Sequence, residues 1–298
     1  MTTERPNRLE TLEPGVRRVL APNASPMTYW GTNTYIIGEG RVAVIDPGPA
    51  IEPHMHAILD ALSPGETISH IFVTHSHIDH SPLAAPLARR TGAPVIAYGD
   101  SFSGRSDVMN DLAAADLAGG GEGVDLDFSP DETLADGETL SGDSWHLNAI
   151  WTPGHFGNHL SFAWDDRVFT GDHIMGWASS LVSPPDGDLT AFMTSTEKLA
   201  SRRDRVFYPG HGAAITNPVA RARWLINHRQ TRSAAIITTL QDGSSDVKSL
   251  TAKIYVDVSP NLIGMAERNV FAHLIDLVHH SHVQAEPELA FNAHFSLI

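Results

Sequence analysis

The stretch Thr74-His75-Ser76-His77-Ile78-Asp79-His80 places three histidines and one aspartate within six residues. It follows a short apolar, β-branched run over residues 68–74, which is typical of a buried strand. It precedes residues 81–90, whose pattern predicts a helix that ends before Gly92. The cluster therefore lies where a buried strand passes into a helix.

The spacing within this cluster suits metal binding. His75 and His77 are two residues apart in an extended segment, so both imidazoles can point to the same side. Asp79 and His80 follow as the chain enters the helix, and they can point to a neighbouring position. Because a protein core has little use for such a group, the stretch predicts a metal site.

Three more segments place one metal-type ligand each after a predicted strand. They are Thr152-Pro153-Gly154-His155, Thr170-Gly171-Asp172-His173 and Tyr208-Pro209-Gly210-His211-Gly212. In each segment a glycine lies beside the ligand, where it lets the backbone turn closely. The order and position of the segments predict that their ligands meet the first cluster.

Composition restricts the chemistry of such a site. The 298 residues include 17 histidines and no cysteine, which excludes disulfides, thiol catalysis and thiolate metal ligands. The formal net charge is -15, and between Arg105 and Arg167 there are 13 acidic residues and no Lys or Arg. This charge argues against a general polyanion-binding surface. A metal site must use nitrogen and oxygen ligands.

The motif and its three downstream ligands resemble those of the metallo-β-lactamase-fold hydrolases, over roughly residues 15 to 215. The resemblance implies an α/β fold, an αββα sandwich, and a site for two Zn²⁺ ions, with manganese or iron as alternatives. It implies that one metal is bound by His75, His77 and His155, that the other is bound by Asp79, His80 and His211, and that Asp172 bridges both.

Other polar residues near the motif receive supporting roles. The resemblance implies that Asp46 supports the histidine loop from behind the ligands and that Asp79 also orients the nucleophile. His173, beside the predicted bridging aspartate, is a candidate general acid, with a packed histidine as the alternative. His159 is interpreted as a structural hydrogen-bonding residue near the site. His54, at a helix start, is expected to be exposed and not a ligand.

The chain changes character after residue 216. Helices are predicted over residues 219–240, 246–256 and 262–280, followed by a closing strand in residues 290–298. Together with His228-Arg229 and Ser259-Pro260-Asn261-Leu262, this part resembles the branch named for β-lactamase-like protein two, which implies a winged-helix domain. The expected domains are therefore a catalytic domain over residues 1–215 and a winged-helix domain over residues 216–298.

These features predict a dinuclear-zinc hydrolase that acts on an ester, thioester, lactam or phosphodiester bond. An endoribonuclease on single-stranded RNA, a glyoxalase-II-like thioesterase, and a non-catalytic nucleic-acid-binding module remain as alternatives. Residues 217–298 hold seven Lys plus Arg and seven Asp plus Glu, so no basic stripe for RNA is evident. The expected partners are a small-molecule or single-stranded RNA substrate and no membrane, with a homodimer left open. The absence of an N-terminal apolar run predicts a cytoplasmic location.

Overall fold

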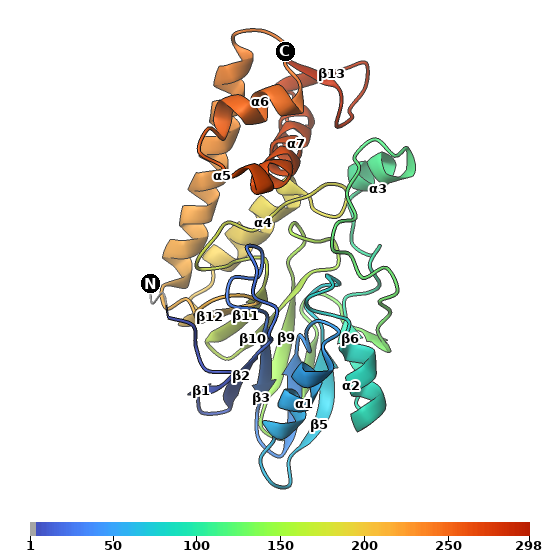
Figure 1. Ribbon diagram of the computed structural model, residues 1–298, viewed down its shortest axis with the longest axis vertical. Coiled ribbons are helices and arrows are strands. Elements are labelled where there is room, and N and C mark those ends of the chain that lie inside the picture. The colour runs from blue at the N-terminus through green and yellow to red at the C-terminus, as the bar shows by residue number, and fades with distance from the viewer. Residues whose placement is uncertain (1–3) are drawn as a thin grey trace.

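The structure is a computed structural model that describes residues 4–298, and Figure 1 shows two facing β-sheets with a helical domain at one end. The first sheet has the strand order β1-β2-β3-β4-β5-β6-β7. Its strands are β1 (Leu9–Glu13), β2 (Val16–Leu20), β3 (Asn33–Ile37), β4 (Arg41–Ile45), β5 (Thr67–Phe72), β6 (Val95–Ala97) and β7 (Glu132–Thr133). Pairing is antiparallel from β1 to β4 and parallel from β4 to β7.

The second sheet has the order β12-β11-β10-β9-β8. Its strands are β8 (Thr139–Ser141), β9 (His146–Trp151), β10 (Leu160–Trp164), β11 (Arg167–Gly171) and β12 (Val206–Pro209). Only β11 and β12 pair in parallel. The carboxyl ends of β11 and β12 consequently meet at the same edge, and each of these strands is followed by one of the predicted ligand segments.

Apolar side chains fill the space between the sheets. Phe72 meets Phe162 with ring centroids 5.2 Å apart, and Tyr35 meets Phe169 at 5.1 Å. The central strands β3, β4, β10 and β11 are buried on both faces because helices cover the outer sides, which explains why they read as continuous apolar runs. Helices α1 (Glu52–Asp60) and α2 (Ala84–Thr91) pack on the first sheet, and α4 (Leu189–Ala200) packs on the second. The predicted αββα sandwich is confirmed.

The C-terminal part has the helices and hairpin of a winged helix, as predicted. It comprises α5 (Pro218–Leu240), α6 (Val247–Ile254), a 3₁₀ turn (Pro260–Leu262), α7 (Ile263–His279), and the antiparallel strands β13 (Val283–Glu286) and β14 (His294–Leu297). The expected closing strand is β14, and it pairs with β13 rather than with either sheet of the sandwich.

Two elements join the sandwich to the C-terminal part. The first half of α5 packs on the second sheet through Ala222 and Leu225, whereas Ile236 and Leu240 lie in the C-terminal core. Helix α3 (Asp107–Ala114) lies within the mostly polar residues 99–130, and its Met109 also enters the C-terminal core. The predicted boundary at residue 215 thus lies just before a helix that both cores share. Within residues 4–298, no helix combines the length and the apolar character needed to cross a bilayer.

Candidate metal centre

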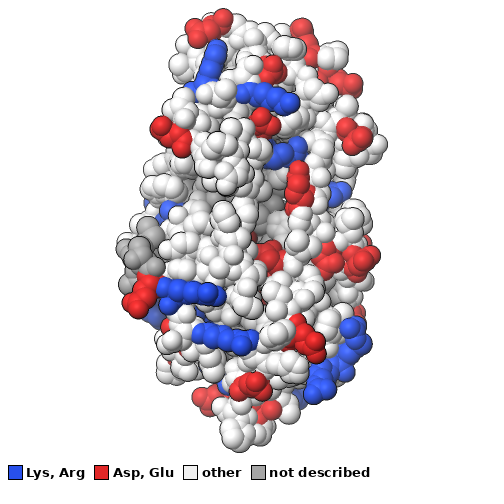
Figure 2. Space-filling view, viewed as in Figure 1, with Lys and Arg blue, Asp and Glu red and all other residues white. Residues whose placement is uncertain are grey.

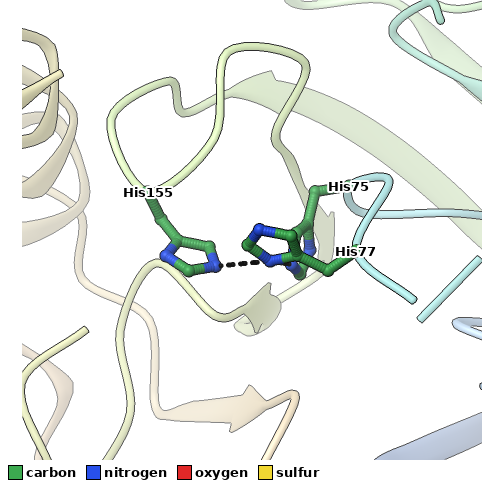
Figure 3. A group of neighbouring side chains, drawn as sticks. All are labelled: His75, His77 and His155. Atoms are coloured by element: carbon green, nitrogen blue, oxygen red, sulfur yellow. Dashed lines mark hydrogen bonds between the residues drawn. The ribbon is translucent and has the colours of Figure 1, made fainter. Parts of the chain in front are cut away.

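Three histidines from two loops converge at one end of the sandwich (Figure 3). His75 and His77 follow β5, and His155 follows β9. His77 Nδ1 lies 2.9 Å from His75 Nε2 and 3.1 Å from His155 Nε2. Since these three nitrogens lie within 4.8 Å of one another, a single cation fits among them.

A second group of ligand-type side chains lies beside the first and contains Asp79, His80 and His211. His211 Nε2 is 3.1 Å from Asp79 Oδ2, and His80 Nε2 is 3.5 Å from the same oxygen. His80 and His211 are buried, whereas Asp79 is partly exposed. This group therefore forms a second position for a cation, with Asp79 on its open side.

Asp172 lies between the two groups. Its Oδ2 is 3.2 Å from His211 Nε2 and 4.0 Å from His155 Nε2. Its Oδ1 and His80 Nε2 are both buried without a hydrogen-bond partner among the described residues. Buried polar atoms normally have partners, so these two atoms indicate that a cation completes the site. The structure thus brings together all seven residues predicted as ligands.

Hydrogen bonds behind the ligands fix their orientation. Asp46 accepts a hydrogen bond from His80 Nδ1 at 2.9 Å and two from Thr74, through its backbone N–H at 2.7 Å and its hydroxyl at 2.8 Å. His155 Nδ1 donates to the carbonyl of Leu181 at 2.7 Å, and His211 Nδ1 donates to that of Gly31 at 3.1 Å. Each of these rings therefore presents Nε2 to the site, as metal-binding histidines do.

The protonation states of the first group suit a cation. Burial lowers the pKa of His77 to about 3, and burial lowers the pKa of His75 and of His155 as well. Burial alone would raise the pKa of Asp172, but His211 and His80 outweigh it and lower that pKa. Neutral imidazoles and an ionised carboxylate are the forms that bind a metal.

The second group predicts that metal binding releases protons. Burial lowers the pKa of His211, but the Asp172 and Asp79 carboxylates outweigh it and raise the pKa to about 9. Below pH 9 the metal-free protein therefore keeps a proton on His211, which the metal must displace. We expect zinc affinity to rise with pH between pH 7 and about 9, with about one proton released from His211 at pH 7.5. Calorimetry of zinc binding in two buffers of different ionisation enthalpy measures this number. A His211→Ala variant should release about one proton fewer, and release unaffected by this variant would contradict the prediction.

Two other histidines lie near the ligands but outside both groups. His159 Nδ1 pairs with the Thr152 hydroxyl at 2.8 Å, and the ring packs beside His75, which agrees with a structural role. His173 is buried against Phe192, and its Nε2 is 3.1 Å from the Thr196 hydroxyl on α4. Burial lowers the pKa of His173 to about 3, and this residue does not line the cavity over the ligands. A neutral ring turned towards α4 does not fit the predicted general acid.

A cavity of about 870 Å³ opens over the ligands. His77, Asp79, His155, Asp172 and His211 form one end of it. Most of the remaining wall comes from residues 116–123, the loop around residues 181–186, the start of α7, and residues 291–292. The site therefore lies in a chamber between the sandwich and the C-terminal domain. Asp116 and Glu122, from the acidic stretch between Arg105 and Arg167, border this chamber.

Hydrogen bonds connect the C-terminal domain to the loop that holds Asp172, and the sequence did not predict them. Arg229 on α5 is fully buried, and it donates hydrogen bonds to the carbonyl of Ser180 and, at 2.9 Å, to Asn269 Oδ1 on α7. The Ser180 hydroxyl in turn donates to the backbone carbonyls of Asp172 and His173. The sequence showed Arg229 within a predicted helix, but no pattern indicated that its side chain reaches the loop that contacts Asp172.

Comparisons with known proteins match both parts of the chain. The model of the metallo-beta-lactamase superfamily matches residues 27–211, and that of the beta-lactamase associated winged helix domain matches residues 247–288. The atrochrysone carboxyl ACP thioesterase of Paecilomyces divaricatus is 30% identical over 260 residues, which cover 84% of this chain and 73% of that protein. The beta-lactamase-like protein 2 homolog of Drosophila melanogaster is 29% identical over 278 residues, or 89% and 88% of the two chains. The resemblance predicted from the motifs is confirmed.

A solved structure shares the whole architecture. The crystal structure of a metallo-beta-lactamase family protein from Thermus thermophilus matches with a TM-score of 0.77 and covers 97% of this chain and 100% of that one. Because the sequence identity is 23%, this match shows a shared fold and nothing about activity. The chain spans 66%, 68% and 73% of the length of three fungal relatives that it matches.

Proposed function

The chain belongs to the metallo-beta-lactamase superfamily and is a hydrolase of that family, and on this premise we propose that it is a dinuclear-zinc thioesterase for a largely apolar acyl group. Two observations support zinc: the site offers only nitrogen and oxygen ligands, and they form two adjacent groups. The names of two similar fungal proteins, which are atrochrysone carboxyl ACP thioesterases, support the thioester.

The observation that carries this proposal is the cavity. Its volume of about 870 Å³ lies within the range of small-molecule sites, about 300–1,000 Å³. Leu117, Met265 and Phe291 contribute apolar surface, and the same space reaches the ligands. An acyl chain bound there loses contact with water while its thioester faces the metals.

Some residues of the site would bind the metals, and others form the wall of the cavity. His75, His77 and His155 would hold one zinc, Asp79, His80 and His211 the other, with Asp172 between them. When bound, two zinc ions supply Lewis acidity, which polarises a scissile carbonyl and makes water a nucleophile near neutral pH. Asp46 keeps His80 in place, and Ile78, which is exposed beside the ligands, contributes an apolar side chain to the cavity wall.

The position of His173 also favours a thioester. A thiol leaves as a thiolate with an ordinary pKa of about 8.5, so its departure needs little help from a general acid. An RNA alkoxide is a much stronger base and benefits from protonation. Because His173 faces α4 with a lowered pKa, the site lacks this proton donor and suits the weaker base.

The C-terminal domain offers little for RNA. Of its seven Lys plus Arg, Arg229 and Arg268 are buried, and Arg221 donates to the carbonyls of Met175 and Ala178. Figure 2 shows that the blue Lys and Arg side chains on the face in view alternate with red acidic ones and do not form a stripe. Helix α7 is buried along much of its length and packs towards α4, so it is not free to enter a groove.

A substrate panel tests the proposal. We expect purified, zinc-loaded protein to hydrolyse hexanoyl-N-acetylcysteamine at least about 100-fold faster, in kcat/KM, than nitrocefin or a single-stranded RNA. Thiol release can be followed with a disulfide reagent without protein background, because the chain contains no cysteine. Chelation should abolish turnover and leave the circular dichroism spectrum unchanged. Faster cleavage of RNA, or turnover that survives removal of the metal, would refute the thioesterase.

A further inference from the structure

One arginine lines the cavity and has a hydrogen-bond donor without a partner among the described residues. Arg268 lies on α7, in the wall that the C-terminal domain contributes, and only 9% of its surface is exposed. It is the only Lys or Arg among the residues that line the cavity in the described part of the chain. The acidic lining residues include Asp116, Glu122 and Glu267.

The hydrogen bonds of Arg268 leave its charge unpaired. Nε donates to the Ser183 hydroxyl at 2.9 Å, and Nη1 donates to the carbonyl of Ala118. Nη2 is buried and has no partner within residues 4–298. Since both partners are neutral, they fix the guanidinium in position without neutralising it.

The nearby carboxylates do not form an ion pair with Arg268. Asp186 accepts hydrogen bonds from Arg105 and, at 2.9 Å, from the backbone N–H of Gly121. Burial lowers the pKa of Arg268, and the Glu122 and Asp186 carboxylates oppose this shift from a distance. Glu122 is exposed, and within the described chain no carboxylate lies within ion-pair distance of Arg268. A buried cation that no anion contacts is costly, so its retention beside a substrate cavity points to an anion that arrives with the substrate.

Glycines let the loop pack closely against the guanidinium. A Cβ atom at Gly120 would lie 3.1 Å from Arg268 Nη2 and 2.6 Å from Pro185 Cδ, and the φ of +101° there favours glycine. Gly119 is similarly close, because its Cβ would lie 3.5 Å from Nη1. The run Gly119-Gly120-Gly121 thus lets the backbone lie against Arg268 without a side chain that would displace the guanidinium from the cavity wall.

From this arrangement we infer that Arg268 binds an anionic group of the thioester substrate. This inference rests on the proposed thioesterase function. A guanidinium pairs well with the oxygens of a carboxylate or a phosphate. The anion is either a carboxylate carried by the acyl group or the phosphate of a phosphopantetheine arm, and in both cases Arg268 acts in substrate binding.

Two pairs of thioesters distinguish these sources. Adipoyl- and hexanoyl-N-acetylcysteamine differ by a carboxylate on the acyl group, and the hexanoyl thioesters of 4′-phosphopantetheine and pantetheine differ by a phosphate. We expect one anionic compound to exceed its neutral counterpart by about tenfold or more in kcat/KM, mainly through KM. Arg268→Met should remove this preference. It should change kcat/KM for the neutral compound by less than about threefold.

Control variants separate binding from structure. Arg232→Met removes another C-terminal arginine, which donates to the carbonyl of Ile254 away from the cavity, and it should keep the full preference. If Arg268→Met does not fold, Arg268→Lys keeps the cation but loses the planar fork, and the preference should fall at least threefold. Equal rates for both pairs in the wild type, or a preference that Arg268 variants retain, would overturn the inference.

Failure of the thioesterase proposal has a different outcome. If no thioester is hydrolysed, all four compounds are stable ligands, and calorimetry can measure their binding directly. About tenfold tighter binding of an anionic compound, lost in the Arg268 variants, would still support the anion site. Equal affinities of the wild type for each charged and neutral pair would refute it.

Discussion

Replacement of Asp172 by Asn is expected to lower kcat/KM by about 10³-fold or more. Asp172 Oδ2 lies 3.2 Å from His211 Nε2 and 4.0 Å from His155 Nε2, so this carboxylate serves both groups of ligands. The amide has nearly the same shape but lacks the negative charge that balances two cations. Metals contribute several kcal/mol of transition-state stabilisation, and about 4 kcal/mol corresponds to about 10³-fold in rate.

Measurements of kcat/KM and of bound zinc by mass spectrometry check this result. Asp143→Asn, a change of the same kind at an exposed carboxylate away from the cavity, should leave both quantities within about twofold. We expect Asp172→Asn to retain less than the wild-type zinc content while its thermal unfolding in chelator matches that of metal-free wild type. An Asp172→Asn enzyme with both zinc ions and normal turnover would contradict the bridging position.

The ligand set could be predicted because its residue types are rare in cores and its spacing follows strand ends. His75, His77, Asp79 and His80 come from one continuous segment, where local geometry decides the outcome. Asp172 and His211 were each predicted to follow a strand, and the structure adds that these strands, β11 and β12, pair in parallel, which brings their ends together. Asp46 was expected behind the ligands, and it does hold His80.

Features that depend on packing between distant segments could not be predicted. His54 was expected to be exposed, but α1 turns it inward, its Nε2 pairs with the Thr34 hydroxyl at 2.8 Å, and burial lowers its pKa to about 4. The carbonyls of Gly31 and Leu181 orient His211 and His155. Every residue type has a backbone carbonyl, so the sequence does not indicate which carbonyl accepts such a hydrogen bond. A sequence pattern does not reveal such tertiary partners.

The cavity is the largest feature that the sequence did not reveal. Its wall joins residues 116–123 to α7 and to residues 291–292, which lie far apart along the chain. Asp116 and Glu122, which belong to the acidic stretch between Arg105 and Arg167, line the cavity. The same region contributes α3 to the C-terminal core. The C-terminal domain therefore shapes the substrate space directly, and does more than cover one end of the sandwich.

Gly210→Ala is expected to abolish binding of at least one zinc ion and to lower kcat/KM by about 100-fold or more. A Cβ atom at this position would lie 2.3 Å from Asp172 Oδ1 and 2.7 Å from His80 Cε1. The φ of Gly210 is not in the left-handed region, so alanine does not strain the backbone. The methyl group instead displaces two side chains whose positions define the metal site, and ligand geometry tolerates only small changes.

The matched control is Gly264→Ala on α7. A Cβ atom there would meet nothing within 4 Å, and its φ is also outside the left-handed region. Alanine favours a helix over glycine by about 1 kcal/mol, so this variant should bind zinc normally and unfold at an equal or higher temperature. In chelator, Gly210→Ala should unfold within a few degrees of wild type, because the two closest atoms that it displaces are side-chain ends. Normal zinc content in Gly210→Ala would show that Asp172 and His80 can move without loss of the site, and would refute the close packing inferred for the second group of ligands.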